Sequence, residues 1–136
     1  MSMDLCYMSE DNVVGSLCNM SNTNSNRFRN FVADVLQDNV THCQEVVDSQ
    51  FTTATGESDY DAWRLEVAQE EKDELKEAKD LYDRWSTDAC TVSDVCSVMT
   101  LVMFDPNVPQ YKGYVYRILS QGVKVLTNSN AKAYWA

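Results

Sequence analysis

The sequence predicts an all-α fold, arranged as a single-domain bundle or an orthogonal array of four to five helices. Apolar side chains recur at steps of three and four residues over two long stretches, which is the spacing of one helix face. Capping patterns of the S/T-x-x-D kind precede the second of these stretches and a later apolar segment. The chain has 136 residues, four glycines and two prolines, and a length that suits one domain.

The first 48 residues predict a short helix, a loop and a long helix. Ser9 is a suitable N-cap for a helix over residues 10–20, which Gly15 weakens. The polar run over residues 21–26 is typical of a loop. From Arg27 to about Asp48 the apolar residues follow one helical face: Phe28, Phe31, Val32, Val35, Leu36, Val40, Cys43, Val46 and Val47.

A second long helix is expected after the threonine-rich residues 51–57. Ser58 and Asp61 form the capping pattern, and the helical period continues for about seven turns to Trp85. Residues 69–74 are polar nearly all round, so this part either projects past the body or spans a narrow part of it. We expect Trp63 and Trp85 to pack in or beside the core.

The last third of the chain predicts a buried helix, a turn and a further helix. Thr91 and Asp94 form the second capping pattern before the apolar run 95–104, and residues 105–109 contain both prolines in a turn. Residues 111–126 fit one helix face, but Gly113 and Gly122 leave a β-hairpin over 113–126 as the alternative. We therefore expect one helical domain over residues 1–127 and a polar C-terminal tail over 128–136.

Composition predicts an intracellular protein in a reducing compartment, which would be the host cytoplasm for a virus-encoded protein. The five cysteines form an odd set without a C-x-x-C pair, which is typical of free thiols. Residues 1–20 lack a basic region and do not resemble a secretory signal. No window approaches about 18 uncharged apolar residues, so we expect no membrane span.

The sequence offers no catalytic signature, and we expect a protein that is not an enzyme. His42 is the single histidine and lies beside Cys43, but adjacent residues on a helix point about 100° apart, so it cannot readily serve as that thiol's base. The spacing of the cysteines and His42 does not match a zinc site, and Glu-x-x-His pairs and phosphate-binding loops are missing. We therefore expect no metal and no cofactor.

Acidic residues form two rows at helical spacing, and these are the candidate partner-binding residues. The first row comprises Asp34, Asp38, Glu45 and Asp48, and the second comprises Glu66, Glu70, Asp73, Glu77 and Asp80. Five charges over 14 residues give roughly one charge per 5 Å, whereas duplex DNA carries one per ~1.7 Å. Imitation of a duplex would therefore require the two rows to align; otherwise they are solvated faces that aid solubility.

Charge is also unequal between the two ends of the chain. Of the net charge of −10, residues 106–136 carry +4 and the first 105 carry −14. Oppositely charged ends can attract in neighbouring copies, with Lys132, Tyr134 and Trp135 as the assembly residues, or within one copy if the basic stretch folds back on the acidic helix. The basic and aromatic residues of this stretch could also stack single-stranded bases, although ordinary packing explains half of the aromatics.

These observations predict a non-enzymatic acidic interaction protein that binds or inhibits a nucleic-acid-handling partner through a carboxylate-rich helical surface. The partner is expected to be a protein with a basic surface, because the field of the body repels the phosphates of a duplex. A small acidic domain of this kind is a common profile for viral or phage accessory proteins, nucleic-acid mimics among them. The alternative is a structural subunit that forms a homo-oligomer through its oppositely charged ends.

Overall fold

The computed structural model describes residues 2–50, 53–126 and 131–136, and it is mainly helical. The elements follow in the order β1 (Ser2–Met8), β2 (Val14–Ser21), α1 (Asn22–Asp48), α2 (Ser58–Ser86), α3 (Val92–Met103), the 3-10 helix η1 (Val108–Tyr111), α4 (Lys112–Val125) and β3 (Lys132–Trp135). The strands form an antiparallel sheet in the order β2-β1-β3. The mainly helical prediction is thus confirmed, but the strands show that all-α is only roughly right.

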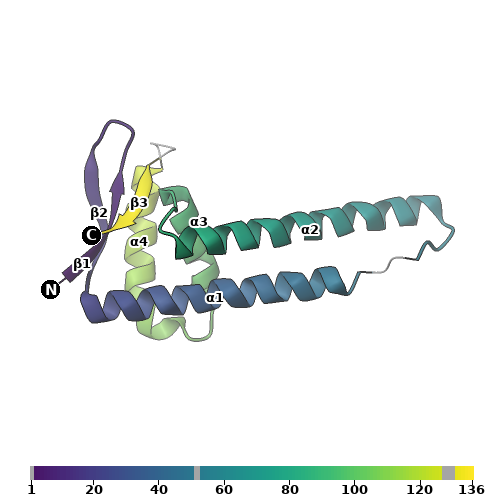
Figure 1. Ribbon diagram of the computed structural model, residues 1–136, viewed down its shortest axis with the longest axis horizontal. Helices are drawn as coiled ribbons and strands as arrows, with labels where there is room; N and C mark the ends of the chain where they lie inside the picture. The colour runs from purple at the N-terminus through teal and green to yellow at the C-terminus, as the bar shows by residue number, and fades with distance from the viewer. Residues whose placement is uncertain (1, 51–52, 127–130) are drawn as a thin grey trace.

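The molecule has a compact head and a long arm (Figure 1). The head contains the sheet, α3, α4 and the adjoining ends of α1 and α2, and it holds most of the buried apolar side chains. The arm consists of residues 37–48 of α1 and 58–81 of α2, which lie side by side and antiparallel. In α1 the buried positions end at Leu36, while on α2 Leu75 and Ala78 are still buried in the part of the arm next to the head, where Leu101 of α3 lies near Ala78.

The expected helix over residues 10–20 is wrong, because this segment belongs to a β-hairpin. The Ser9 hydroxyl does accept a bond from a backbone N–H, that of Val13 (3.1 Å), but it does so inside the turn between β1 and β2. Asn12 occupies the left-handed region at φ 62°, which asparagine tolerates well. Leu17 is an extra residue in the register and is buried together with Cys18, so the alternation typical of a strand is broken by a bulge.

The C-terminal segment also differs from expectation, because residues 132–135 form a strand and not a tail. β3 pairs with β1, and Ala133 within β3 is buried. The Trp135 ring meets the Trp85 ring edge-on, with centroids 6.3 Å apart, and the Arg29 guanidinium lies 5.0 Å from the Trp135 centroid. The part of the expected tail at 128–130 lies outside the described residues.

The long helices have the expected C-terminal ends, while their starts differ. α1 begins at Asn22, inside the segment expected to be a loop, because the Ser21 hydroxyl caps it by accepting from the Asn24 backbone N–H (3.1 Å). α2 begins at Ser58 as expected, but Glu57 is the N-cap and its side chain makes no capping bond. The expected partner of Ser58, Asp61, instead binds the preceding loop.

The predictions for α3 and α4 are confirmed. Thr91 and Asp94 form the complete capping box at the start of α3, and both Nε and Nη2 of Arg84 bind the Asp94 carboxylate, at 3.0 and 3.1 Å. α4 is a helix, so the alternative hairpin over 113–126 does not form. Its Gly122 faces α3 so closely that an added Cβ would lie 2.7 Å from the Cys96 sulfur.

The two tryptophans of α2 have different surroundings. Trp85 is buried as expected, and its indole N–H donates to the Arg29 carbonyl (3.3 Å). Trp63 was also expected in or beside the core, but it is 57% exposed. It lies beside the last turn of α1, where the arm offers no third element to cover it.

Candidate functional site

The arm holds most of the protein's net charge. Its 36 residues carry 12 of the 21 acidic side chains and four of the 11 basic ones, whereas the other 100 residues carry nine and seven. The ion pairs found in the described part of the chain are Arg29–Asp88, Arg64–Asp61 and Arg84–Asp94. None of these pairs uses a member of the two acidic rows. The fold therefore concentrates charge on a projecting element and leaves the head close to neutral.

All nine acids of the two rows are exposed, as a binding surface requires: Asp34, Asp38, Glu45, Asp48, Glu66, Glu70, Asp73, Glu77 and Asp80. Eight of them lie on the arm, and Asp34 lies just before it on α1. Glu77 also lines a groove with Cys43 of α1. Burial raises the pKa of the Cys43 thiol, and the nearby carboxylate of Glu74 raises it further. The sequence thus located the charged surface.

The structure does not merge the two rows into one surface. Cys43 and Val46 on α1 face Ala78 and Val67 on α2 across the line of contact. At about 100° per residue, most members of each row lie on the side of their helix that points away from the other helix, while Glu77 lies at the edge of the groove beside Cys43. The rows therefore occupy the outward sides of the arm, and the alignment needed to approach the charge density of a duplex does not occur.

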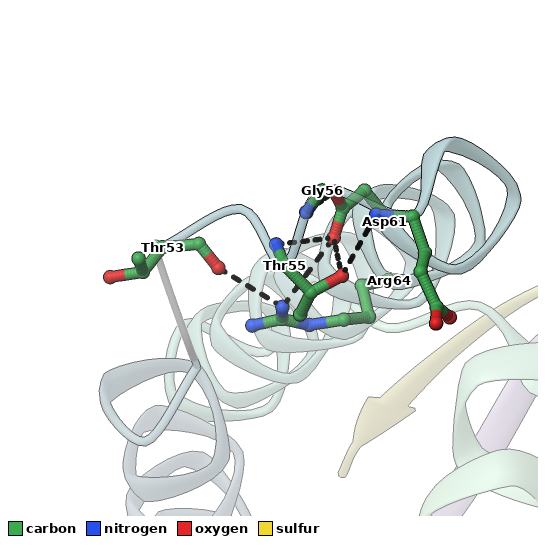
Figure 2. Close-up of polar contacts among 6 residues, drawn as sticks. Thr53, Thr55, Gly56, Asp61 and Arg64 are labelled. Carbon is green, nitrogen blue, oxygen red and sulfur yellow. Dashed lines mark hydrogen bonds and ion pairs between the residues drawn. The ribbon is translucent and has the colours of Figure 1, made fainter.

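The tip of the arm is a hydrogen-bonded loop, shown in Figure 2. The Asp61 carboxylate accepts bonds from the Thr55 backbone N–H (3.0 Å), the Thr55 hydroxyl (2.9 Å) and the Gly56 N–H (3.3 Å). The bond from the Thr55 N–H is the largest cause of the lowered pKa of Asp61. Arg64 lies 3.8 Å from the same carboxylate and donates to the Thr53 carbonyl (3.1 Å), so one acid and one base hold the loop against α2.

Beside this loop lies an aromatic groove that the sequence reasoning missed. The Tyr60 and Trp63 rings have centroids 5.9 Å apart, and the Arg64 guanidinium lies 5.5 Å from the Tyr60 centroid. A groove of about 230 Å³ runs between these residues and the last turn of α1, lined among others by Val46, Gln50, Tyr60, Trp63, Val67 and Glu71. The helical period led us to expect Trp63 in or beside the core, whereas the polar stretch 69–74 was the signal that this part of α2 lies outside it.

Helix α4 carries a basic and partly apolar face on the head. Lys112, Tyr116, Arg117 and Val123 are all exposed, with Tyr116 at 49% and Val123 at 61%. The Lys112 ammonium lies 5.7 Å from the Tyr116 ring centroid.

The expected assembly residues are placed differently from the sequence interpretation. Lys132 is exposed, but Tyr134 is half-buried in β3, and Trp135 packs against Trp85 and Arg29. Trp135 therefore lies within the head and is not an anchor on a loose tail.

The cysteines and the histidine do not form a reactive cluster. Burial raises the pKa of the Cys90 thiol to about 12, and it also raises the pKa values of Cys6, Cys18, Cys43 and Cys96. These groups are consequently protonated at neutral pH and are weak nucleophiles. Over residues 2–50, 53–126 and 131–136, the structure contains no group of three or more His, Cys, Asp or Glu side chains that could hold a metal ion.

The described helices also lack a stretch that is long and apolar enough to cross a membrane. No family model, curated protein or solved structure matches the chain.

Proposed function

We propose that this protein is a non-enzymatic interaction protein whose acidic arm binds the basic surface of a nucleic-acid-handling partner. The observation that carries the proposal is the concentration of exposed carboxylates on an element that projects from the head (Figure 1). A projecting arm reaches into a concave site that a flat surface cannot enter. A partner that holds nucleic acid already has such a site, lined with lysine and arginine.

The charge spacing defines which feature of nucleic acid the arm resembles. Five acids over 14 residues of α2 give roughly one charge per 5 Å, against one per ~3.4 Å for a single strand within a duplex. The α2 row thus has about two-thirds of the charge density of one strand, and the α1 row, with four acids over the same length, has about half. Because the rows lie on outward sides of the arm, each is expected to occupy the track of one phosphate backbone and not that of a whole duplex.

Competition on immobilised DNA tests the proposal. Lysate proteins are bound to DNA–cellulose at physiological salt, and the purified protein is then added to the column. We expect the protein to release one or a few DNA-bound proteins without itself binding the column. The α2 row variant, with Glu66, Glu70, Asp73, Glu77 and Asp80 changed to Lys, is expected to release none of them.

A matched control separates the location of charge from its total. The double variant Glu70→Lys/Asp73→Lys changes net charge by the same amount as Asp11→Lys/Asp83→Lys, whose sites are exposed and lie outside the arm. We expect weakened release from the arm variant and unchanged release from the control. Release that survives the five-residue variant, or that falls equally in both double variants, contradicts binding through the acidic row.

A further inference from the structure

Two exposed surfaces of opposite character lie at opposite ends of the molecule (Figure 1). The first is the aromatic groove at the arm tip, formed around Tyr60 and Trp63. The second is the exposed face of α4 around Tyr116 and Val123. Exposed aromatic and aliphatic side chains that gather on one surface are candidates for an interaction site.

The groove at the tip has a mixed lining of apolar and polar side chains, with an excess of acidic residues around it. Val46 and Val67 lie with the two rings in its lining, and Glu71 adds a carboxylate. Residues 57–70 carry five acids and one base, and that base, Arg64, is engaged by Asp61 and the Thr53 carbonyl. An occupant that fits this groove has an aromatic or aliphatic side chain flanked by positive charge.

The α4 face of the same protein has this chemistry. Tyr116 is exposed with the Lys112 ammonium 5.7 Å from its ring centroid, whereas the side chain of the neighbouring Arg117 interacts with the Cys18 thiol of β2. Between residues 106 and 136 the chain has four basic residues and no acidic one. The face therefore offers an aromatic side chain with a positive charge beside it.

One copy cannot join its own two surfaces. The arm is a pair of packed helices that points away from the head, so the tip lies far from α4 (Figure 1). The sequence left open a fold-back of the basic stretch onto the acidic helix, but α4 and β3 lie in the head, away from the arm tip. We propose that the arm tip of one copy docks on the α4 face of a second copy, with Tyr116 entering the groove beside Trp63.

The size of the two surfaces predicts a weak contact. Two half-exposed aromatic side chains at the tip contribute on the order of 150–250 Å² of apolar surface, since an aromatic side chain buries ~150–250 Å² when fully covered. Such a contact belongs below the ~1,200 Å² at which specific stable interfaces begin. Dissociation constants in the micromolar to millimolar range follow, and the contact is expected to weaken as salt screens the charges.

The symmetry of the contact predicts how the oligomer grows. Tip and α4 face are different surfaces, so the contact is head-to-tail and leaves one free tip and one free face in every oligomer that does not close into a ring. The average mass should rise continuously with concentration above the 15.5 kDa monomer instead of stopping at a dimer.

Sedimentation of two complementary variants tests the proposal. Trp63→Ala removes an aromatic wall of the groove, and Tyr116→Ala removes the side chain proposed to enter it. Both residues are exposed enough for the fold to tolerate the change. Each variant alone should sediment as a 15.5 kDa monomer, while an equimolar mixture should form a species of about 31 kDa and none larger, because the intact tip of one variant meets the intact face of the other. Circular dichroism verifies that both variants keep their helix content.

Two exposed apolar residues outside these surfaces provide matched controls. Leu65 is 73% exposed, about 160° around α2 from Trp63, and Phe104 is 81% exposed at the end of α3. Leu65→Ala and Phe104→Ala should associate like the original protein. An original protein that stays monomeric up to about 1 mM at low salt overturns the proposal, as does association that persists in either single variant or a mixture that remains monomeric.

Discussion

Replacement of Gly122 by Ala tests how α3 and α4 pack in the head. A Cβ at position 122 would lie 2.7 Å from the Cys96 sulfur, while the nearest atom of Val92 would be at an ordinary 3.8 Å. Overpacking of this kind costs about 1–3 kcal/mol, whereas Ala stabilises a helix interior by about 1 kcal/mol relative to Gly. Gly122→Ala should therefore lower the free energy of unfolding by about 0–2 kcal/mol.

A double-mutant cycle makes this reasoning decisive. Cys96→Ala removes the sulfur that would clash and by itself costs about 1 kcal/mol of burial. In the Cys96→Ala/Gly122→Ala variant the clash is gone and the helix gain remains, so its stability should return to about that of the original protein. The coupling energy is then about 1–3 kcal/mol, measured by urea unfolding followed by circular dichroism. A coupling below about 0.5 kcal/mol, the level of independent sites, would refute the close contact.

Three further predictions address the core, the C-terminal strand and the arm tip. Trp85→Ala should lower the free energy of unfolding by about 3–5 kcal/mol, because the ring is buried between the sheet and α1. Trp63→Ala should lower it by less than about 1 kcal/mol, because that ring is exposed. Equal losses in urea titrations would contradict the different burial of the two rings. Deletion of residues 131–136 should lower the melting temperature by several degrees, because β3 and its contact with Trp85 are lost; a thermal transition unchanged by the truncation would show that the strand contributes nothing. Because the pKa of Asp61 is lowered, its carboxylate stabilises the tip loop above the ordinary carboxyl pKa near 3.8, and this contribution is lost as the pH falls through the lower folded value. The Thr55 amide should therefore exchange its hydrogen fast in Asp61→Asn at neutral pH but not in the original protein, and the difference should disappear in strong acid. Equal exchange at neutral pH would show that the carboxylate does not hold the loop.

Local sequence information determined where the helices lie. The period of apolar residues placed α1, α2, α3 and α4, and the Thr91–Asp94 capping box marked the start of α3 correctly. These features depend on residues three or four positions apart, so they are visible in the chain itself. The exposure of the nine acidic residues was determined in the same way, because charges on the side opposite an apolar face remain in water.

Strand pairing depended on contacts between distant residues. Residues 132–135 form a strand because β1, about 130 positions earlier, supplies the partner backbone, and four residues alone give too little pattern to predict this. The Ser9 hydroxyl has the chemistry of a helix cap, and only the pairing of residues on either side of it made the segment a hairpin turn.

The candidate sites show the same division between local pattern and tertiary structure. The helical period predicted that Trp63 lies on the apolar side of α2. This is correct, since that side faces α1. Whether such a side is buried depends on how many elements cover it, and at Trp63 the arm has only two helices, whereas at Trp85 the head closes around the ring. The sequence by itself therefore determined the helices and their charged faces. The tertiary structure decided which apolar residues are left exposed and that the two acidic rows point apart, because burial and alignment depend on neighbouring elements and not on one helix.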